Sequence, residues 1–421
     1  MSDHISLGVI ARAFPPDRVR QVVAETGKAS ERERDLPAHV IVYYAIALAL
    51  YAGSSTREVL RCLLEGLRWL WGAEAVRVAG KSGISQARTQ LGEEPLRRLH
   101  EQVVRPVATP ATKGAWYRQW RLVSLDGSCL DVADTEANRT AFGRPGAGRG
   151  ESAFPQVRFV ALVENGTHVL FGTRLGRFEE GEAMLAREAL RALRSGMLCL
   201  ADRQFFGHAL WQEAVASGAN LLWRVKRNLR LPREVRLVDG SYLTTIYPRE
   251  KDRRHKAAGV QVRVIEYRLE GVADAEPLYR LVTTILDPAA APAAELAALY
   301  HERWEIEGAL AELKTHLRGA RTHGPAQQDT RACPAGVLGP AAGPLRHPWP
   351  DARGGAAGRR GPGPALVPAR GARGPAQAAV VRGPSPLGAG APCMRRYWTR
   401  SWRSASQAAE ADRCRAGSSA R

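Results

Sequence analysis

Two aspartates follow short apolar segments in the middle of the chain. Asp126 comes after LVSL and Asp202 comes after LCLA, and short apolar runs of this kind are typical of buried strands. A carboxylate at the end of a buried strand is costly unless it faces a metal ion or a cationic partner. Two such aspartates therefore suggest a site that requires a third ligand.

The third carboxylate is expected on a long helix, predicted from about Ala293 to Leu317. Four of its residues are offset by 0, 3, 7 and 14 positions, which at 3.6 residues per turn places them within an arc of about 60°. They are Tyr300, Arg303, Glu307 and Lys314. The neighbouring acids that project to the opposite side are Glu302, Glu305 and Glu312. Glu307 is therefore the predicted inward carboxylate. The apolar stripe that would dock the helix on a sheet consists of Leu299, Ile306, Leu310 and Leu317.

Two aspartates and a glutamate supply hard oxygen ligands suited to Mg²⁺ or Mn²⁺. Two such ions can activate a water or a 3′-hydroxyl and stabilise the leaving oxygen of an in-line displacement at phosphorus. The predicted chemistry is phosphodiester cleavage or strand transfer. Arg303 would pair with phosphates through a bidentate fork and Lys314 as a point charge. The alternative for both is a solvated face that forms salt bridges with Glu307, and Tyr300 could simply pack at the helix margin.

These patterns together resemble the DDE transposases of bacterial insertion sequences, specifically the insertion-sequence-four family. The resemblance covers about residues 5 to 322 and is carried by LDGS at Asp126, ADRQFFG at Asp202 and the Y-x2-R-x3-E-x6-K spacing of the helix. Gln204 stands where that family commonly has glycine. The resemblance implies an α/β, ribonuclease H-like catalytic domain with a β-rich insertion at residues 229–286. It also implies Asp126, Asp202 and Glu307 as metal ligands, with the other three residues of the helix pattern contacting transposon-end DNA.

The activity implied by this resemblance is cut-and-paste transposition. Such a protein binds terminal inverted repeats in double-stranded DNA, nicks them with metal-bound water and uses the freed 3′-hydroxyl for transesterification, usually as a homodimer on the DNA. A location in the cytoplasm, at the nucleoid, would follow. One rival function is a divalent-metal nuclease on the same fold, which would not join 3′ ends to target DNA. Another is a catalytically dead DNA-binding remnant.

The elements that must position these residues begin near Arg121. RLVSLDGSCLDV is predicted to be a strand, and the two apolar runs around Asn165-Gly166 predict a hairpin, which gives a three-stranded meander. A helix at residues 182–193, a strand at 197–202, a helix at 207–216 and a strand at 220–226 follow. Further strands are expected at residues 236–247, 260–269 and 278–286, before the long helix.

Residues 1–115 are predicted to form a helical N-terminal domain that binds DNA, with a plain helical bundle as the alternative. Residues 36–51 carry dense apolar periodicity, and the S-T-R-E sequence from Ser55 to Glu58 is a capping box that opens a second helix. A further helix near Ser85 ends at Gly92, and another starts with Pro95 in its first turn. The catalytic domain would then occupy residues 116–322.

A basic segment, WRVKRNLR, follows the second aspartate. Arg224, Lys226 and Arg230 have even spacings, which on a strand would place them on one face as a stripe of phosphate contacts. An exposed charged strand face without a ligand explains the spacing equally well.

The chain's composition favours a polyanionic partner and a reducing compartment. Its 61 basic and 42 acidic residues give a net charge of +19. The six cysteines lie far apart without a zinc or disulfide pattern, and the longest apolar run, from His39 to Gly53, is too short to span a membrane. We therefore expect a protein that is neither secreted nor membrane-spanning.

The composition changes after Thr322. Gly and Pro make up 39 of the first 322 residues but 28 of the last 99, and the tail contains 15 Arg against 4 acidic residues and no Lys, Ile, Phe or Asn. Residues 323–421 are predicted to be a disordered tail. Because the missing amino acids have A/T-rich codons, we interpret the tail as GC-rich DNA read out of frame. A genuine basic nucleic-acid-binding tail is the alternative. Loss of the in-frame helices would leave little or no activity.

Overall fold

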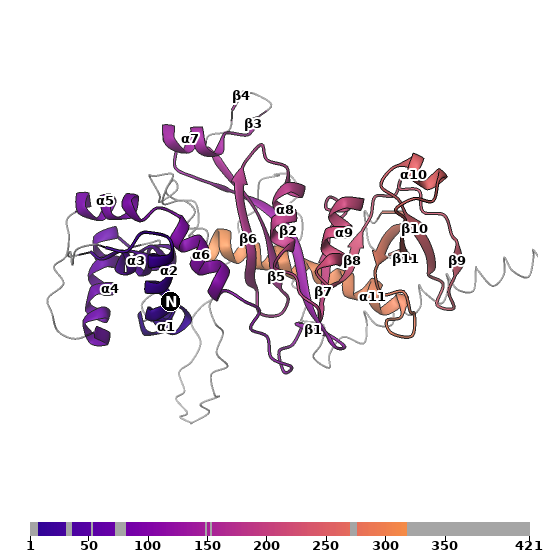
Figure 1. Ribbon diagram of the computed structural model, residues 1–421, viewed down its shortest axis with the longest axis horizontal. Helices are drawn as coiled ribbons and strands as arrows, with labels where there is room; N and C mark the ends of the chain where they lie inside the picture. The colour runs from indigo at the N-terminus through magenta and orange to yellow at the C-terminus, as the bar shows by residue number, and fades with distance from the viewer. Residues whose placement is uncertain are drawn as a thin grey trace, which may run out of the picture.

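The computed structural model describes residues 7–30, 36–51, 54–71, 81–147, 150–151, 154–269 and 276–317. The tail predicted for residues 323–421 lies outside these ranges. Along the longest axis of the molecule, a group of helices, a central sheet with helices on both faces, and a β-rich region follow one another (Figure 1).

The helical group is built around one helix that is buried on nearly every side. Helix α3 (Ala38–Leu50) shares one hydrophobic core with five other helices, which are α1 (Leu7–Ala13), α2 (Pro16–Glu25), α4 (Thr56–Trp71), α5 (Lys81–Leu91) and α6 (Glu94–Val103). The predicted helix start at Ser55 is confirmed, because its Oγ accepts a hydrogen bond from the Glu58 N–H at 3.2 Å. Gly92 has a φ of +70° and separates α5 from α6, as the sequence indicated.

A mixed sheet forms the centre of the molecule. Strand β2 (Trp120–Asp131) pairs antiparallel with β5 (Gln156–Glu164), which pairs antiparallel with β6 (Val169–Arg177). On its other side β2 pairs in parallel with β7 (Met197–Ala201), and β7 pairs in parallel with β8 (Asn220–Arg224). The resulting order β6-β5-β2-β7-β8 confirms the predicted meander and the α/β, ribonuclease H-like fold class. Three short strands lie outside this order. Strand β1 (Trp116–Tyr117) pairs with β2. Strands β3 (Gly146–Ala147) and β4 (Gly150–Glu151) pair with each other and follow helix α7 (Glu136–Phe142).

The meander depends on a tight hairpin between β5 and β6. Gly166 lies in the connection with a φ of +79°, and a Cβ there would be only 2.3 Å from the carbonyl oxygen of Lys113. Glycine is therefore required at this position for both its conformation and its size. This confirms the hairpin that the Asn165-Gly166 pair predicted.

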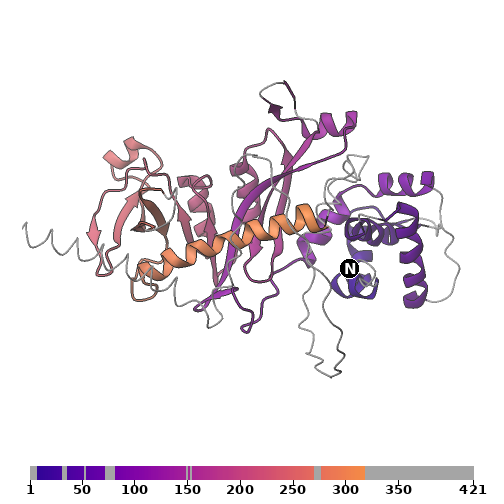
Figure 2. The same cartoon turned by 180° about the vertical axis from the view of Figure 1, so that it is seen from behind.

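The two faces of the central sheet are covered by different helices. Helices α8 (Glu182–Leu190) and α9 (His208–Ala216) pack against the face that carries Val123 and Leu125 of β2. The opposite face, which carries Leu122 of β2 and Leu200 of β7, packs against the long helix near the end of the described chain. Figure 2 shows that helix, in orange, running across the sheet.

The β-rich region continues the central sheet. Strands β12 (Tyr279–Thr283), β11 (Val260–Tyr267), β10 (Tyr242–Ile246) and β9 (Val235–Arg236) follow β8 in the order β8-β12-β11-β10-β9, and α10 (Glu250–Arg254) lies between β10 and β11. The single strand predicted for residues 236–247 is wrong: the chain turns at Asp239 and Gly240 and pairs back on itself. The strand predicted through Lys226 is also wrong, because β8 ends at Arg224.

A buried carboxylate joins the helical group to the sheet. Glu164, at the end of β5, is fully buried, accepts hydrogen bonds from the backbone N–H groups of Val107 and Ala108, and pairs with Arg121. A buried charge is tolerated only when its oxygens are paired in this way. Glu164 therefore fixes the segment that connects α6 to β1.

None of the helices in the described part of the chain combines the length and the apolar content needed to cross a lipid bilayer.

Candidate active site

Asp126 and Asp202 lie next to each other on the sheet. Leu125 of β2 is the register partner of Ala201 of β7, so each aspartate is the next residue along one of two adjacent parallel strands. Because side chains alternate along a strand, both aspartates belong to the face of Leu122 and Leu200, which the long helix covers. The following N–H of each donates to its Oδ1, from Gly127 at 2.8 Å and from Arg203 at 2.6 Å.

The long helix is continuous but not uniformly α-helical. It consists of α11 (Ala293–Tyr300), a 3-10 turn η2 (His301–Trp304), α12 (Glu305–Ala311) and a π-helical end η3 (Glu312–Leu317). The long helix predicted for residues 293–317 is confirmed, but the 3-10 turn and the π-helical end were not predicted. Departures of this kind are frequent at functional sites, and here the 3-10 turn contains Arg303 and the π-helical end contains Lys314.

The apolar stripe of this helix docks as predicted. Leu299, Ile306 and Leu310 are buried against the sheet, whereas the side chain of Leu317 lies outside the described residues.

Glu305 and Glu312, which the spacing predicted to lie on the side of the helix opposite Glu307, contact the β5–β6 hairpin. Glu305 Oε2 accepts a hydrogen bond from the Gly166 N–H at 2.6 Å, and Glu312 lies 3.1 Å from Nδ1 of His168. Burial raises the pKa of the Glu302 carboxyl to about 7, with a further contribution from Glu305. These contacts fix the rotation of the helix about its axis, and so leave Glu307 on the side of Asp126.

Arg303 joins two of the three predicted ligands. Its guanidinium lies 3.3 Å from Asp126 Oδ2 and 3.7 Å from Glu307 Oε1, and its side chain is only 11% exposed. The structure thus brings one carboxylate from the sheet and one from the helix to the same cation. Asp202 is the strand neighbour of Asp126 and completes the acidic group.

The electrostatics of the site reflect this proximity. Burial raises the pKa of Asp126, and the charge of Asp202 adds to that effect, while the Gly127 N–H and Arg303 oppose it. Burial likewise raises the pKa of Glu307; Arg303 lowers it, and the charges of Asp126 and Asp202 raise it. The charges of both aspartates therefore affect the pKa of Glu307, as expected for three acids around one site.

The three acids match the donor chemistry of a hard divalent cation, but their placement is not that of a closed coordination sphere. All three offer only oxygen, and the guanidinium of Arg303 offsets the repulsion at Asp126 and Glu307. Within the described residues, no three acidic, histidine or cysteine side chains stand close enough together to hold an ion as they are placed. The residue types fit Mg²⁺ or Mn²⁺, and the side chains would have to rearrange to bind it.

Lys314 and Tyr300 occupy different surroundings. Lys314 is exposed and its Nζ donates to Ser128 Oγ, two residues beyond Asp126 on the same face of β2. Tyr300 is buried, with its hydroxyl donating to the carbonyl of Ala201 at 3.4 Å. Burial raises the pKa of the Tyr300 hydroxyl. Tyr300 thus packs beneath the strand end that carries Asp202.

Arg224 and Lys226 do not share a strand face. Arg224 is the last residue of β8, forms an ion pair with Glu276 at 2.7 Å and lies over the ring of Tyr279 at 4.7 Å. Lys226 follows in an exposed connection. The predicted stripe through both residues is therefore wrong: Arg224 ends β8, next to the strand that precedes Asp202, and Lys226 lies beyond that end.

Three residues near the acids were not identified from the sequence. Arg203 follows Asp202 and forms an ion pair with Glu276 at 2.8 Å, so Glu276 links two arginines beside the site. Burial, together with Arg224 and Arg303, lowers the pKa of His301 to about 4, which keeps its ring neutral at physiological pH. No spacing indicated Glu276, because it approaches the site from a distant part of the chain. His301 lies on the long helix itself, directly after Tyr300, but it is not part of the Tyr300, Arg303, Glu307 and Lys314 spacing. The position of Arg203 directly after Asp202 was a usable signal.

Comparison with known proteins identifies the chain's relatives. The model of the insertion element 4 transposase N-terminal domain matches residues 4–101, and that of the transposase DDE domain matches residues 119–332. The transposase InsG for insertion sequence element IS4, from Escherichia coli (strain K12), is 25% identical over 308 residues, which are 73% of this chain and 68% of that protein. The putative transposase InsZ of the same strain is 22% identical over 220 residues, 52% of this chain and 71% of that protein.

The DDE domain model covers just over half of the chain and includes all three acids and the helix that carries Glu307. The chain therefore belongs to the DDE transposases, within the insertion-sequence-four family.

Proposed function

We propose that the chain binds the terminal inverted repeats of an insertion sequence and catalyses divalent-metal-dependent hydrolysis and strand transfer at their phosphodiester bonds. The observation that carries the proposal is the joint approach of Asp126 and Glu307 to Arg303, with Asp202 adjacent on the sheet. In the proposed site, these residues from three distant parts of the chain would act together at the end of parallel strands, on the face covered by the long helix.

Asp126, Asp202 and Glu307 would hold Mg²⁺ or Mn²⁺, in a site for two ions. When bound, the ions supply an activated nucleophile and stabilise charge at the leaving oxygen. The repulsion among the three carboxylates supports this role, because a cation relieves it.

The cationic side chains around the acids would bind and orient the DNA. Arg303 provides a planar fork that can exchange its carboxylate partners for a phosphate, and Lys314 provides an exposed charge on the same side of the helix. Tyr300 holds the end of β7 through the Ala201 carbonyl and so orients Asp202. Arg224 and Lys226 extend the basic surface beyond β8.

The wider arrangement follows from this role. The helical group would contact the inverted repeat, two copies of the chain would pair the two ends of the element, and the protein would act in the cytoplasm at the nucleoid. Without residues 323–421, which carry 15 basic and 4 acidic residues, the chain has 46 basic and 38 acidic residues, and this net charge of +8 supports the DNA-binding part of the proposal.

We further propose that residues 323–421 result from a change of reading frame and leave the chain with little or no activity. The compositional change after Thr322 supports this, and residues 333–421 are matched by neither of the two family models. A catalytically dead DNA-binding remnant is the second candidate function, favoured by this tail.

The decisive experiment compares the chain with a frame-restored version on DNA that carries the ends of its own element. With Mg²⁺, the restored chain should cleave the ends and join the 3′-hydroxyls to target DNA, and its Asp126→Asn variant should do neither. Cleavage without joining would support a nuclease instead. Robust end cleavage by the chain as it stands would contradict the proposed loss of activity, and an Asp126→Asn variant as active as the parent would remove the proposed site.

A further inference from the structure

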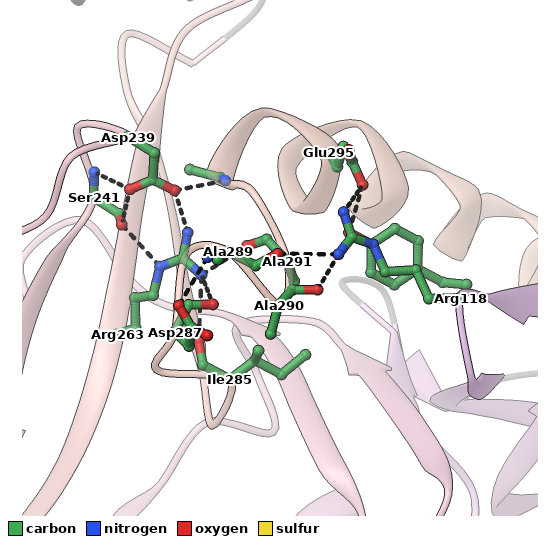
Figure 3. A network of polar contacts seen from close by, with 12 residues as sticks. Arg118, Asp239, Ser241, Arg263, Ile285, Asp287, Ala289, Ala290, Ala291 and Glu295 are labelled. Carbon is green, nitrogen blue, oxygen red and sulfur yellow. Dashed lines mark hydrogen bonds and ion pairs between the residues drawn. The ribbon is translucent and has the colours of Figure 1, made fainter.

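An arginine with no exposed surface lies at the base of the long helix. Arg263 is on β11 and is 0% exposed. A buried guanidinium is tolerated only when its donors are matched by acceptors. It pairs with Asp239, and Figure 3 shows its further hydrogen bonds to the Ser241 Oγ at 2.8 Å and to the Ala291 carbonyl at 2.7 Å. The carbonyls of Ile285 and Asp287 also accept from it, at 3.3 Å and 3.4 Å.

Asp239 connects this cluster to the first residue of the helix. Its Oδ2 accepts a hydrogen bond from the Ala293 N–H at 2.8 Å, where α11 begins. The residue before α11 is Pro292, which provides no side-chain cap. A carboxylate that is distant in sequence therefore satisfies one of the free N–H groups of the helix and lies favourably at its positive end.

A second arginine holds the same loop from the other side. Arg118, between β1 and β2, donates to the carbonyls of Ala289 and Ala290 and forms an ion pair with Glu295 at 3.1 Å (Figure 3). Tyr117 donates to the same Glu295 carboxylate at 2.7 Å. The segment between β12 and α11 is thus held between the β-rich region and the central sheet.

We propose that Arg263 and Asp239 are positioning residues that set where the long helix starts and thereby place Glu307 against Asp126. Glu307 follows Ala293 by 14 residues, which corresponds to about 21 Å of continuous helix. A slip of one residue at the start would turn the glutamate by about 100° and move it by about 1.5 Å, because each residue contributes that rotation and rise. The β-rich region then serves the reaction by fixing the helix, without touching the reacting atoms.

This inference rests on the proposed role of Glu307 as a metal ligand, and it predicts an effect at a distance. Loss of the Arg263 contacts should loosen α11 and α12 together, because they form one helix. Loss of supporting contacts around a metal site typically weakens binding of the ion about 10- to 100-fold, and we expect about tenfold here because Arg263 acts through the helix.

The test uses the full chain and two measurements that do not require turnover. Hydrogen–deuterium exchange should be faster across residues 293–311 in Arg263→Gln than in the parent chain, and Mn²⁺ affinity, followed by electron paramagnetic resonance of the free ion, should fall about tenfold. Arg263→Lys keeps the charge and should recover part of both. Leu60→Ala, a cavity variant in the helical group, serves as the matched control for general destabilisation and should change neither.

The opposite pattern would overturn the proposal. Faster exchange confined to residues 235–267, with residues 305–311 and Mn²⁺ affinity as in the parent chain, would show that Arg263 stabilises only the β-rich region. If Arg263→Gln does not fold, Asp239→Asn removes charge from the helix start while retaining the buried arginine, and the same two readouts decide. An unchanged Mn²⁺ affinity in Glu307→Gln would instead refute the role of Glu307 as a metal ligand, and with it the proposed effect of Arg263 on metal binding. The hydrogen–deuterium exchange data would still show whether Arg263 fixes the long helix.

Discussion

Replacement of Arg303 by methionine should strengthen the binding of a divalent ion while weakening the fold. In the structure the Arg303 guanidinium shares the oxygens of Asp126 and Glu307. A bound ion would use the same carboxylates, so the arginine and the ion compete. Methionine retains much of the aliphatic stem and removes the competing charge.

The size of the effect follows from the exposure of the two ion pairs. The Glu307 side chain is 48% exposed, so its pair with Arg303 at 3.7 Å contributes at most about 1 kcal/mol. The ion pair between Arg303 and Asp126 is better buried. Its contribution to the free energy therefore lies between those of exposed and buried ion pairs. We expect the two ion pairs together to oppose ion binding by about 1–2 kcal/mol. Their loss in Arg303→Met then corresponds to a gain of about 5- to 30-fold in ion affinity.

The assay is a Mn²⁺ titration without DNA, in parallel with urea unfolding. At about pH 8 the Arg303→Met chain should bind Mn²⁺ more tightly and unfold more easily than the parent chain. Arg303 lowers the pKa values of Asp126 and Glu307, so its loss raises both. The folded variant then holds protons more strongly than the unfolded chain, and its stability deficit should shrink as the pH falls towards about 5.

Arg187→Met is the matched control, because Arg187 pairs with Glu213 on the opposite side of the sheet. It should leave Mn²⁺ affinity unchanged. Equal or weaker Mn²⁺ binding by Arg303→Met would refute the competition and with it the shared use of these two carboxylates.

Three further predictions concern the surroundings of the site. Glu302→Gln should stabilise the chain at about pH 8 by up to about 3 kcal/mol and not at about pH 4. The pKa of Glu302 in the folded chain, about 7, lies above the ordinary value of 4.5, so the parent chain loses stability as the pH rises from 4.5 to 7. Equal stability of variant and parent in urea unfolding at both pH values would contradict this. Glu276→Gln should raise the affinity for duplex DNA about three- to tenfold, measured by fluorescence anisotropy, because it releases Arg203 and Arg224 from their ion pairs. The control Glu213→Gln should not raise it. An unchanged affinity in Glu276→Gln would show that these arginines do not contact DNA. Gly166→Ala should lower the free energy of unfolding by about 1–3 kcal/mol, since its φ is +79° and the Lys113 carbonyl blocks a Cβ; a stable alanine variant in thermal unfolding would contradict the hairpin geometry.

Local patterns in the sequence were sufficient for the elements of the core and for the choice of acids. Alternating and continuous apolar runs predicted β2, β5, β6 and β7, because strand periodicity and burial are properties of a few adjacent residues. The helical offsets separated Glu307 from Glu305 and Glu312, and the contacts of the latter two with the hairpin confirm that separation. The same offsets could not reveal the 3-10 turn or the π-helical end, since these depend on what the helix packs against.

The ion-pair partners of Arg203, Arg224 and Arg263 were decided by the tertiary structure. The carboxylate of Glu276 joins Arg203 to Arg224, although Arg224, the nearer of the two arginines in the chain, lies 52 positions earlier. Arg263 and Asp239 meet because β10 and β11 pair, and they reach Ala293 only because the sheet continues beyond β8. Sequence periodicity reports which side of an element is buried, but the partner of a buried charge is chosen by strand order and register, which only the folded chain establishes.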